Sequence, residues 1–248
     1  MSDEAADKPL GGSIAPPLRF VPVAGALSFL DPLAGIPGIR AHWIGRLAGI
    51  PVSTDREETL ARLRPSHEEQ VAAWYGRDRW WRAEQIHGIG VAEVPVPDAA
   101  LKMAGDGLPV MPGVDGLVTN TPGEILGIYV ADCGAIYLAD RGTGAVGLLH
   151  SGKKGSELGI LTEGIELMKA RFGTRAEDLV VVLGPCIRPP HYEIDFAAEI
   201  ARQAEKAGVG EFHDCGADTA ADLESYYSYR IEKGCTGRML ALIGRDAL

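Results

Sequence analysis

Three short apolar stretches of the chain each end on a side chain that can bind a metal or attack a carbonyl group. They are the run ending Gln85-Ile86-His87-Gly88, the run Ile125 to Cys133 and the run Ala145 to His150. A side chain at the end of a buried strand lies where a rigid sheet meets solvent, so three such ends can converge on one pocket. Two histidines and a cysteine form a zinc-ligand set that leaves a fourth position open. The sequence therefore predicts one site containing His87, Cys133 and His150.

Cys133 lies between Asp132 and Gly134, where the second apolar stretch is expected to break. A cysteine in an apolar strand often acts only as a small hydrophobic residue. The glycine that follows favours close approach of the backbone, and a partly exposed thiol beside a cation or metal would become the reactive thiolate. The carboxylate of Asp132 is then a candidate proton shuttle.

His150 opens the segment His150-Ser151-Gly152-Lys153-Lys154-Gly155-Ser156. Two glycines, the expected N-terminus of a helix and the charges of Lys153 and Lys154 together favour binding of an anion such as phosphate. The spacing is not that of a Walker A loop, which argues against a nucleoside triphosphate. The alternative interpretation is a hydrogen-bonded histidine at a strand end, followed by two solvated lysines. His42, His67 and His213 have no comparable setting and are interpreted as surface or core residues.

Composition restricts the class of protein. The chain has 248 residues, of which 46% are hydrophobic, so it can bury a substantial core without disulfides. Its four cysteines lie far apart with no CxxC pair, which is typical of reduced thiols in a cytoplasm. The net charge of -10 argues against nucleic acid or an anionic membrane as partner, and small molecules become the expected ligands. No export signal or membrane-spanning run is recognisable, and the number of subunits cannot be read from the sequence.

The elements that must position the site are short and mixed. Residues 1–17 are expected to form a mobile leader, followed by a short strand over 18–23. Residues 54–75 have helical periodicity with a buried face of Leu60, Leu63, Val71 and Trp74, and Pro65 predicts two helices. Residues 80–86 and 91–96 are expected to form a strand pair. Further β-rich runs are 117–119, 125–131, 136–138 and 145–149.

The second half of the chain adds helices. Ser156 is the expected N-cap of a helix that runs to Phe172 and ends at Gly173. Residues 179–183 predict a buried strand and residues 196–207 an amphipathic helix, whereas 226–230 and 239–243 are weaker candidates for strand or helix. Because strands and helices do not alternate strictly, the chain is predicted to be an α+β protein. It would form a single layered domain over residues 18–248, with a mixed β-sheet flanked by helices.

Six motifs occur in an order that resembles one known family, the purine nucleoside phosphorylases long labelled polyphenol oxidoreductase or laccase-domain proteins. The motifs are Gln85-Ile86-His87-Gly88, Val114-Asp115-Gly116-Leu117-Val118-Thr119, Ala131-Asp132-Cys133, His150 to Gly155, Leu183-Gly184-Pro185-Cys186-Ile187 with Tyr192-Glu193, and Ser228-Tyr229-Arg230 with Thr236-Gly237-Arg238-Met239. The resemblance covers roughly residues 80 to 243. Where the family usually has His-Ala-Gly-Trp-Arg-Gly, this chain has Lys153 and Lys154 in place of the tryptophan and arginine.

The resemblance implies a zinc-dependent enzyme that phosphorolyses adenosine, inosine, guanosine or methylthioadenosine and can also deaminate adenosine. It implies that His87, Cys133 and His150 are the zinc-binding and catalytic residues. Phosphate would contact Lys154, with Lys153 and Arg230 as further candidates.

Three other hypotheses use the same residues. Without a metal, Cys133 as nucleophile with His150 or His87 as base would give a cysteine hydrolase or amidase. The older family label suggests copper-dependent oxidation of phenols, but only six histidines are present and most are scattered, unlike a multicopper centre. A non-catalytic nucleoside-binding protein is the third alternative.

Overall fold

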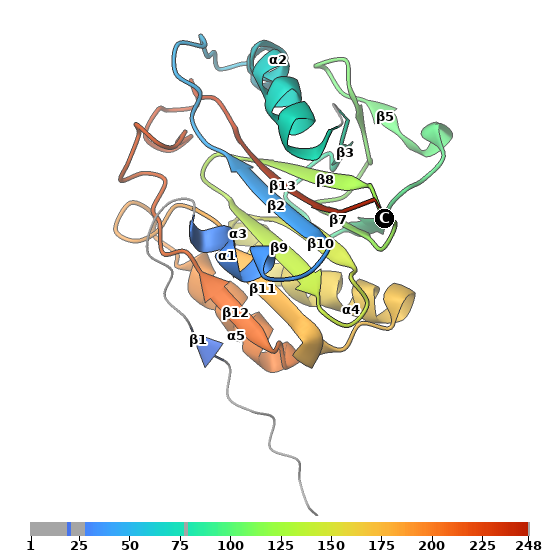
Figure 1. Cartoon of the computed structure of the whole chain (residues 1–248). Helices are drawn as coiled ribbons and strands as arrows, with labels where there is room; N and C mark the ends of the chain where they lie inside the picture. Colours follow the sequence, from blue (N-terminus) through green and yellow to red (C-terminus); the bar gives the residue numbers. More distant parts are fainter. Residues whose placement is uncertain (1–18, 21–27, 77–78, 248) are drawn as a thin grey trace, which may run out of the picture.

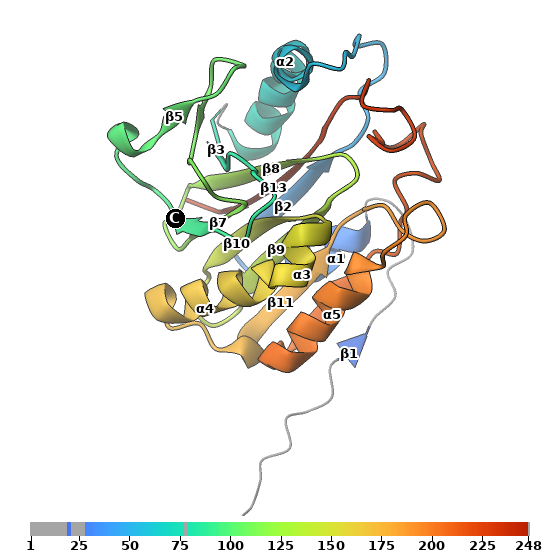
Figure 2. The same ribbon diagram turned by 180° about the vertical axis from the view of Figure 1, so that it is seen from behind.

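The computed structural model of the protein describes residues 19–20, 28–76 and 79–247. Two β-sheets pack face to face at its centre, and helices cover both outer faces (Figure 1). Helix α2 (Arg56–Tyr75) lies on one side; α3 (Lys153–Leu158), α4 (Ile160–Phe172) and α5 (Phe196–Ala207) lie on the other, as Figure 2 shows from behind. The layered α+β prediction is confirmed, with two main sheets. The expected leader, residues 1–17, lies outside the described residues.

Among the described residues, the larger sheet has seven strands and the smaller has four. The order in the larger is β1 (Arg19–Phe20), β12 (Glu211–Asp214), β11 (Leu179–Leu183), β9 (Gly134–Asp140), β10 (Val146–Ser151), β7 (Gly116–Thr119) and β4 (Val91–Glu93). The order in the smaller is β2 (Ile39–Ile44), β13 (Met239–Arg245), β8 (Ile125–Val130) and β3 (Trp81–Arg82). Strands β5 (Lys102–Met103) and β6 (Pro109–Val110) form a separate pair, and α1 (Asp31–Ala34) is a single short turn. In the described part of the chain, 3₁₀ turns span Ser28–Leu30, Asp98–Ala100 and Ala176–Asp178.

The central strands are apolar along their whole length because both of their faces are covered. On β9, Tyr137 packs into the core between the sheets, whereas Ile136 and Leu138 pack against the helices of the outer layer. On β8, Ile128 faces the other sheet and Tyr129 belongs to the cluster under α2. This two-residue alternation follows from strand geometry. Strands β8 and β9 are consecutive in the chain but belong to different sheets, which pack against each other.

The prediction of two helices around Pro65 is wrong, because α2 is one helix of 20 residues with Pro65 inside it. Asp55 caps it by accepting hydrogen bonds from the backbone N–H groups of Glu57 and Glu58. Tertiary packing compensates for the proline, since the face that carries Leu60 and Val71 is buried against the smaller sheet. Trp74 is 47% exposed and stacks on His42 instead of joining that face.

The helix expected from Ser156 is in fact two helices, α3 and α4, separated by Gly159 in a left-handed conformation (φ 93°). Gly152 is the N-cap of α3, so the first helix begins before Ser156. The Ser156 hydroxyl donates to the carbonyl of Gly152 and does not cap. Gly173 ends α4 as expected, with φ 70°.

The expected pairing of residues 80–86 with 91–96 is also wrong. Strand β3 pairs in parallel with β8 in the smaller sheet, and β4 pairs in parallel with β7 in the larger one. The segment between them therefore crosses from one sheet to the other and carries His87. Residues 226–228 are irregular and residues 229–230 lie in a turn, while β11 and α5 have the predicted bounds. Among the described residues, no helix is both long and apolar enough to span a membrane.

Candidate metal site

His87, Cys133 and His150 converge at the junction of the two sheets. One potential ligand atom from each residue lies within 4.8 Å of the others. The two imidazole rings are 4.9 Å apart between centroids and almost perpendicular, at 80°. His150 is buried, Cys133 is partly buried and His87 is exposed, so the cluster opens to solvent on one side.

The fold explains this convergence. Cys133 lies in the connection between β8 of the smaller sheet and β9 of the larger one. His150 is near the end of β10, and the pairing of β10 with β9 aligns it with Ala135, two residues after Cys133. His87 is supplied by the crossing segment after β3. Gly152 allows the close packing, since a Cβ atom there would lie 2.8 Å from the Cys133 sulfur.

Asp115 connects both histidines and is completely buried. Its Oδ1 accepts hydrogen bonds from the backbone N–H of His87 at 2.8 Å and from Nδ1 of His150 at 2.9 Å. Its Oδ2 accepts the N–H of Gly88 at 2.7 Å. Burial alone would raise the pKa of Asp115, but the hydrogen bonds from His150, Gly88 and His87 lower it. Nδ1 of His150 thus donates to a carboxylate, which leaves Nε2 free for a ligand.

Gln85 holds the crossing segment against β8. Its side-chain amide donates to the carbonyl of Tyr129 at 2.5 Å and accepts the N–H of Tyr129 at 3.0 Å. Gln85 and His87 both have left-handed backbones, with φ of 62° and 61°. Such φ values are uncommon for residues other than glycine, so the anchors at Asp115 and Tyr129 stabilise the turn that presents His87.

The electrostatics of the cluster favour a thiolate. Burial would raise the pKa of Cys133, but the neighbouring imidazoles of His150 and His87 lower it to about 6. Burial would lower the pKa of His150, yet Cys133 and Asp115 raise it to about 9. Two imidazoles and a thiolate are a donor set that fits zinc with one position open. The described part of the chain contains no other comparable cluster.

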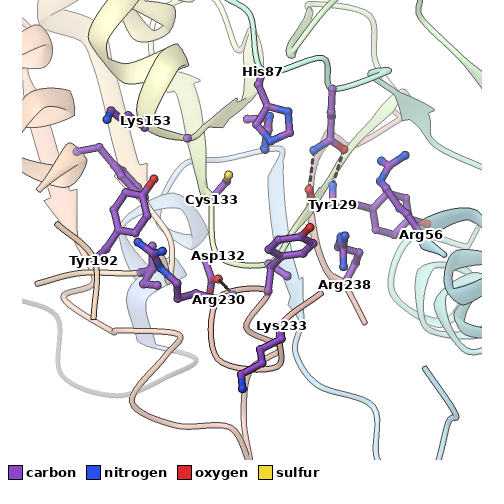
Figure 3. A pocket seen from close by; sticks show the side chains of 17 residues that line it. Arg56, His87, Tyr129, Asp132, Cys133, Lys153, Tyr192, Arg230, Lys233 and Arg238 are labelled. Carbon is purple, nitrogen blue, oxygen red and sulfur yellow. Dashed lines mark hydrogen bonds between the residues drawn. The ribbon is translucent and has the colours of Figure 1, made fainter. Parts of the chain in front are cut away.

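The three residues line a pocket of about 640 Å³. Figure 3 shows Cys133 near its centre, with Lys153 and Tyr192 on one side and Arg56 and Arg238 on the other. Aromatic side chains contribute much of the wall, namely Tyr129, Tyr192, Phe196 and Tyr229. Five cationic side chains also line it, namely Arg56, Lys153, Arg230, Lys233 and Arg238. The pocket therefore combines surfaces for a planar ring with positive charge.

The other residues singled out in the sequence are only partly brought together. Lys153, Lys154 and Arg230 are all exposed, but only Lys153 and Arg230 line the pocket. Arg230 stacks over the ring of Tyr192 at 4.9 Å and pairs with Glu193. Asp132 also lines the pocket, and both of its carboxylate oxygens already accept hydrogen bonds, from the Thr219 hydroxyl and from the backbone N–H of Arg230.

Several residues of the site were not assigned a role from the sequence. Asp115, Gln85 and Arg238 occur in the quoted motifs, but nothing in their local spacing shows which groups they contact. Arg56 comes from the start of α2, outside every motif. A signal for Asp115 did exist, because a charged residue directly before a buried strand needs a partner.

The family model described as multi-copper polyphenol oxidoreductase laccase matches residues 52–199 and 190–246. The purine nucleoside phosphorylase YlmD of Geobacillus stearothermophilus is 29% identical over 231 residues, which are 79% of this chain and 82% of the relative. A purine nucleoside phosphorylase of Deinococcus radiodurans is 32% identical over 200 residues, which are 70% and 73% of the two chains.

Solved structures show the same fold. The crystal structure of YlmD from Geobacillus stearothermophilus superposes with a TM-score of 0.71 at 26% identity, covering 86% of this chain and 93% of the other. The hypothetical protein YfiH of Bacillus licheniformis gives a TM-score of 0.69 at 20% identity, covering 84% and 93%. The sheet stacking that joins His87, Cys133 and His150 thus belongs to a shared architecture.

Proposed function

Because the chain belongs to the multi-copper polyphenol oxidoreductase laccase family, whose relatives include proteins named purine nucleoside phosphorylase, we propose that it phosphorolyses purine nucleosides with the help of zinc. The convergence of His87, Cys133 and His150 within 4.8 Å at a cationic, aromatic pocket carries this proposal. The proposed substrates are adenosine, inosine, guanosine and methylthioadenosine, together with inorganic phosphate.

His87, Cys133 and His150 would hold the metal, with Nδ1 of His150 fixed by Asp115. A zinc ion there supplies Lewis-acid stabilisation of charge that develops on the substrate. A thiolate ligand is stable in a reducing compartment, so a cytoplasmic location is part of the same proposal.

The chain's own groups would bind and orient the two reactants. The purine ring would pack against the aromatic wall, and Lys153 and Arg230 would hold the phosphate. A phosphate oxygen forms the bond to ribose C1′ as the bond from C1′ to the base nitrogen breaks, and the departing base takes up a proton. Holding both reactants in one pocket removes most of the entropic cost of bringing them together.

Deamination of adenosine is a second part of the proposal. It needs a group that moves a proton at the purine, and Asp132 lines the same pocket. Asp132 would have to exchange its hydrogen bond from Thr219 during that step. Conversion of adenosine to inosine in the absence of phosphate tests this activity, and Thr219→Val should alter its rate if Asp132 is the shuttle.

The test of the main proposal is phosphate-dependent release of free base from each nucleoside, with metal content measured on the same sample. We expect base only when phosphate is present, and about one zinc per chain. Lys153→Ala should raise the KM for phosphate by about tenfold, as expected for loss of a charge-assisted hydrogen bond. Lys154→Ala is the matched control from the adjacent position. No base from any nucleoside with zinc bound would refute the proposal and favour a binding protein.

One observation favours a different activity. Cys133, His150 and Asp115 form a connected thiol, imidazole and carboxylate, and the neighbouring imidazoles lower the pKa of the thiol to about 6. That arrangement suits a metal-free cysteine hydrolase. Full activity of metal-stripped protein, with loss on alkylation of Cys133, would establish this alternative. Copper-dependent phenol oxidation would require copper in the same metal analysis.

A further inference from the structure

The pocket carries more positive charge than inorganic phosphate and a neutral nucleoside require. The chain has a net charge of -10, yet five cationic side chains line this one pocket. Within the described part of the chain, Asp132 is the only acidic lining residue. Its two oxygens accept hydrogen bonds from the Thr219 hydroxyl and from the backbone N–H of Arg230, and among the described residues it forms no ion pair with a lining cation. The excess positive charge therefore favours binding of an anionic ligand.

Within the described residues, three of the five cations have no carboxylate partner. Arg56 pairs with Glu57 at 2.8 Å and Arg230 pairs with Glu193. The described residues provide no ion pair for Lys153, Lys233 or Arg238, whereas most other arginines of the described chain are paired. Lys153 and Lys233 are exposed and Arg238 is partly buried, so repulsion is screened least at Arg238, where a bound anion would offset the nearby charge of Arg56.

Arg238 is the most constrained of these cations. Its guanidinium donates to the backbone carbonyls of Thr236 and Gly237 and lies 5.9 Å from the centre of the Tyr229 ring. Burial and the nearby charge of Arg56 lower the pKa of Arg238. Two neighbouring guanidinium groups with donors to spare form a site for a planar or tetrahedral oxyanion.

The cations occupy opposite sides of the metal-ligand cluster. Figure 3 shows Lys153 on one side of Cys133 and Arg56 with Arg238 on the other. An inorganic phosphate bound beside Lys153 therefore leaves Arg56 and Arg238, on the other side of Cys133, available for a second anion. Phosphorolysis requires inorganic phosphate near ribose C1′, so a second anion must be attached to a part of the substrate remote from C1′. In a nucleoside, the remote carbon of the ribose is C5′.

We propose that the preferred substrate is a purine nucleoside 5′-monophosphate, whose phosphate binds Arg238 and Arg56 while inorganic phosphate binds Lys153 and Arg230. This inference rests on the proposed phosphorolysis. The reaction joins a phosphate oxygen to C1′ as the bond from C1′ to the base breaks. The products are the free purine, which takes up the proton that hydrogen phosphate loses, and ribose 1,5-bisphosphate. No oxidant or other co-reactant is needed.

Binding is measured first, on the full chain as purified and without inorganic phosphate. Isothermal titration calorimetry compares adenosine 5′-monophosphate with adenosine. We expect the nucleotide to bind at least about tenfold more tightly, which is the effect of one charge-assisted hydrogen bond. Arg238→Gln should remove the preference and Arg238→Lys should retain part of it. Equal affinities in the wild type, or a preference unchanged in Arg238→Gln, would overturn the inference.

Two further variants keep this test decisive if Arg238→Gln does not fold. Arg56→Gln removes the second guanidinium of the same subsite and should lower the nucleotide preference. Arg62→Gln, an exposed position on the same helix that does not line the pocket, is the matched control and should leave the preference unchanged.

Turnover then separates the two proposals. Release of adenine from the nucleotide with higher kcat/KM than from adenosine supports both. Release from adenosine but not from the nucleotide overturns the nucleotide inference and leaves nucleoside phosphorolysis intact. Release from neither, with zinc bound, refutes phosphorolysis of either substrate, while the binding ratio still decides whether Arg238 and Arg56 form an anion subsite.

Discussion

The buried carboxylate of Asp115 accepts a hydrogen bond from Nδ1 of His150 over 2.9 Å and, with the same oxygen, one from the backbone N–H of His87. One side chain therefore orients the imidazole of His150 and fixes the backbone that presents His87 at the candidate metal site. The register of the larger sheet makes this possible, because β10 pairs with β7 so that Leu149 lies opposite Gly116. His150 follows Leu149 in β10 and Asp115 directly precedes Gly116, the first residue of β7, so the two residues lie next to each other.

Replacement of Asp115 by asparagine should therefore weaken metal binding. The two carboxylate oxygens accept hydrogen bonds from three N–H groups. Asparagine has only one oxygen, so its NH₂ group would face at least one of these donors and could not accept from it. We expect a loss of about 10- to 100-fold in zinc affinity, as for other groups that orient metal-binding histidines. Competition with a chromogenic chelator measures it.

Asp140→Asn is the control for the loss of a buried carboxylate. Asp140 is also fully buried and accepts the N–H groups of Gly142 and Thr143, but at the opposite end of β9 from Cys133. This variant should lose stability and keep its zinc affinity. Equal zinc affinities for wild type and Asp115→Asn would show that Asp115 does not position the ligands.

Gly152→Ala should disturb the site through packing alone. The added Cβ would lie 2.8 Å from the sulfur of Cys133 and 3.7 Å from the ring of His87. Overpacking of this kind costs about 1 to 3 kcal/mol. We expect a lower melting temperature and at least about tenfold weaker zinc binding, since displaced ligands lose the required geometry.

The matched control for this substitution is Gly35→Ala. Gly35 has φ −74°, and its added Cβ would meet no atom closer than 3.9 Å. It should retain wild-type zinc affinity and stability. A Gly152→Ala protein that binds zinc normally would mean that the cluster tolerates movement of Cys133.

The sequence predicted the three converging residues because each follows from a local signal, an apolar run that ends on a chemically active side chain. The predicted bounds of α5 match the structure to the residue. The amphipathic repeat there lies between Asp195, which caps the N-terminus of the helix, and Gly208, which caps its C-terminus. These features depend on neighbours in the chain. Local signals were sufficient there.

Features that depend on distant neighbours were predicted wrongly or not at all. Whether Pro65 breaks α2 depends on packing against the smaller sheet, and the partners of β3 and β4 depend on strands far along the chain. The role of Asp115 requires the β7–β10 register. Arg56 and Arg238 lie on the same side of the pocket although they are separated by most of the chain.

In metal-free protein, the thiol of Cys133 should become a reactive thiolate at a lower pH than an ordinary cysteine does. The imidazoles of His150 and His87 lower its pKa to about 6, so the thiolate is present above that pH and is lost as the pH falls through it. The rate of alkylation by iodoacetamide should rise with a midpoint near pH 6, below the value of about 8.5 for an ordinary cysteine. Mass spectrometry of digests locates the modified residue.

Two comparisons make the alkylation result specific. Cys186 is buried, and burial raises the pKa of its thiol, so it should stay unmodified in the folded protein. Addition of zinc should protect Cys133. A midpoint near pH 8.5 would contradict the electrostatic coupling, and reaction unaffected by zinc would argue against Cys133 as a ligand.

His67 should make the fold less stable in mild acid. It is completely buried on α2, its ring lies 5.6 Å from that of Tyr129, and neither ring nitrogen has a hydrogen-bond partner among the described residues. Burial, and secondarily the charge of Arg82, lower its pKa from 6.5 to about 4. Between these pH values His67 thus stays neutral in the native state, whereas in the unfolded state it takes up a proton. The stability linked to His67 is fully present above pH 6.5 and is lost as the pH falls towards 4.

This linkage predicts a loss of about 2 kcal/mol in the free energy of unfolding between pH 7.5 and pH 5, at about 1.4 kcal/mol per pH unit below 6.5. Urea denaturation at the two pH values measures it. His67→Leu and His67→Phe should each remove this component, since neither side chain titrates, and the phenylalanine also keeps the ring volume beside Tyr129. If both variants lose as much stability at pH 5 as the wild type, the acid sensitivity has another origin and His67 must already be protonated or solvated in the native state.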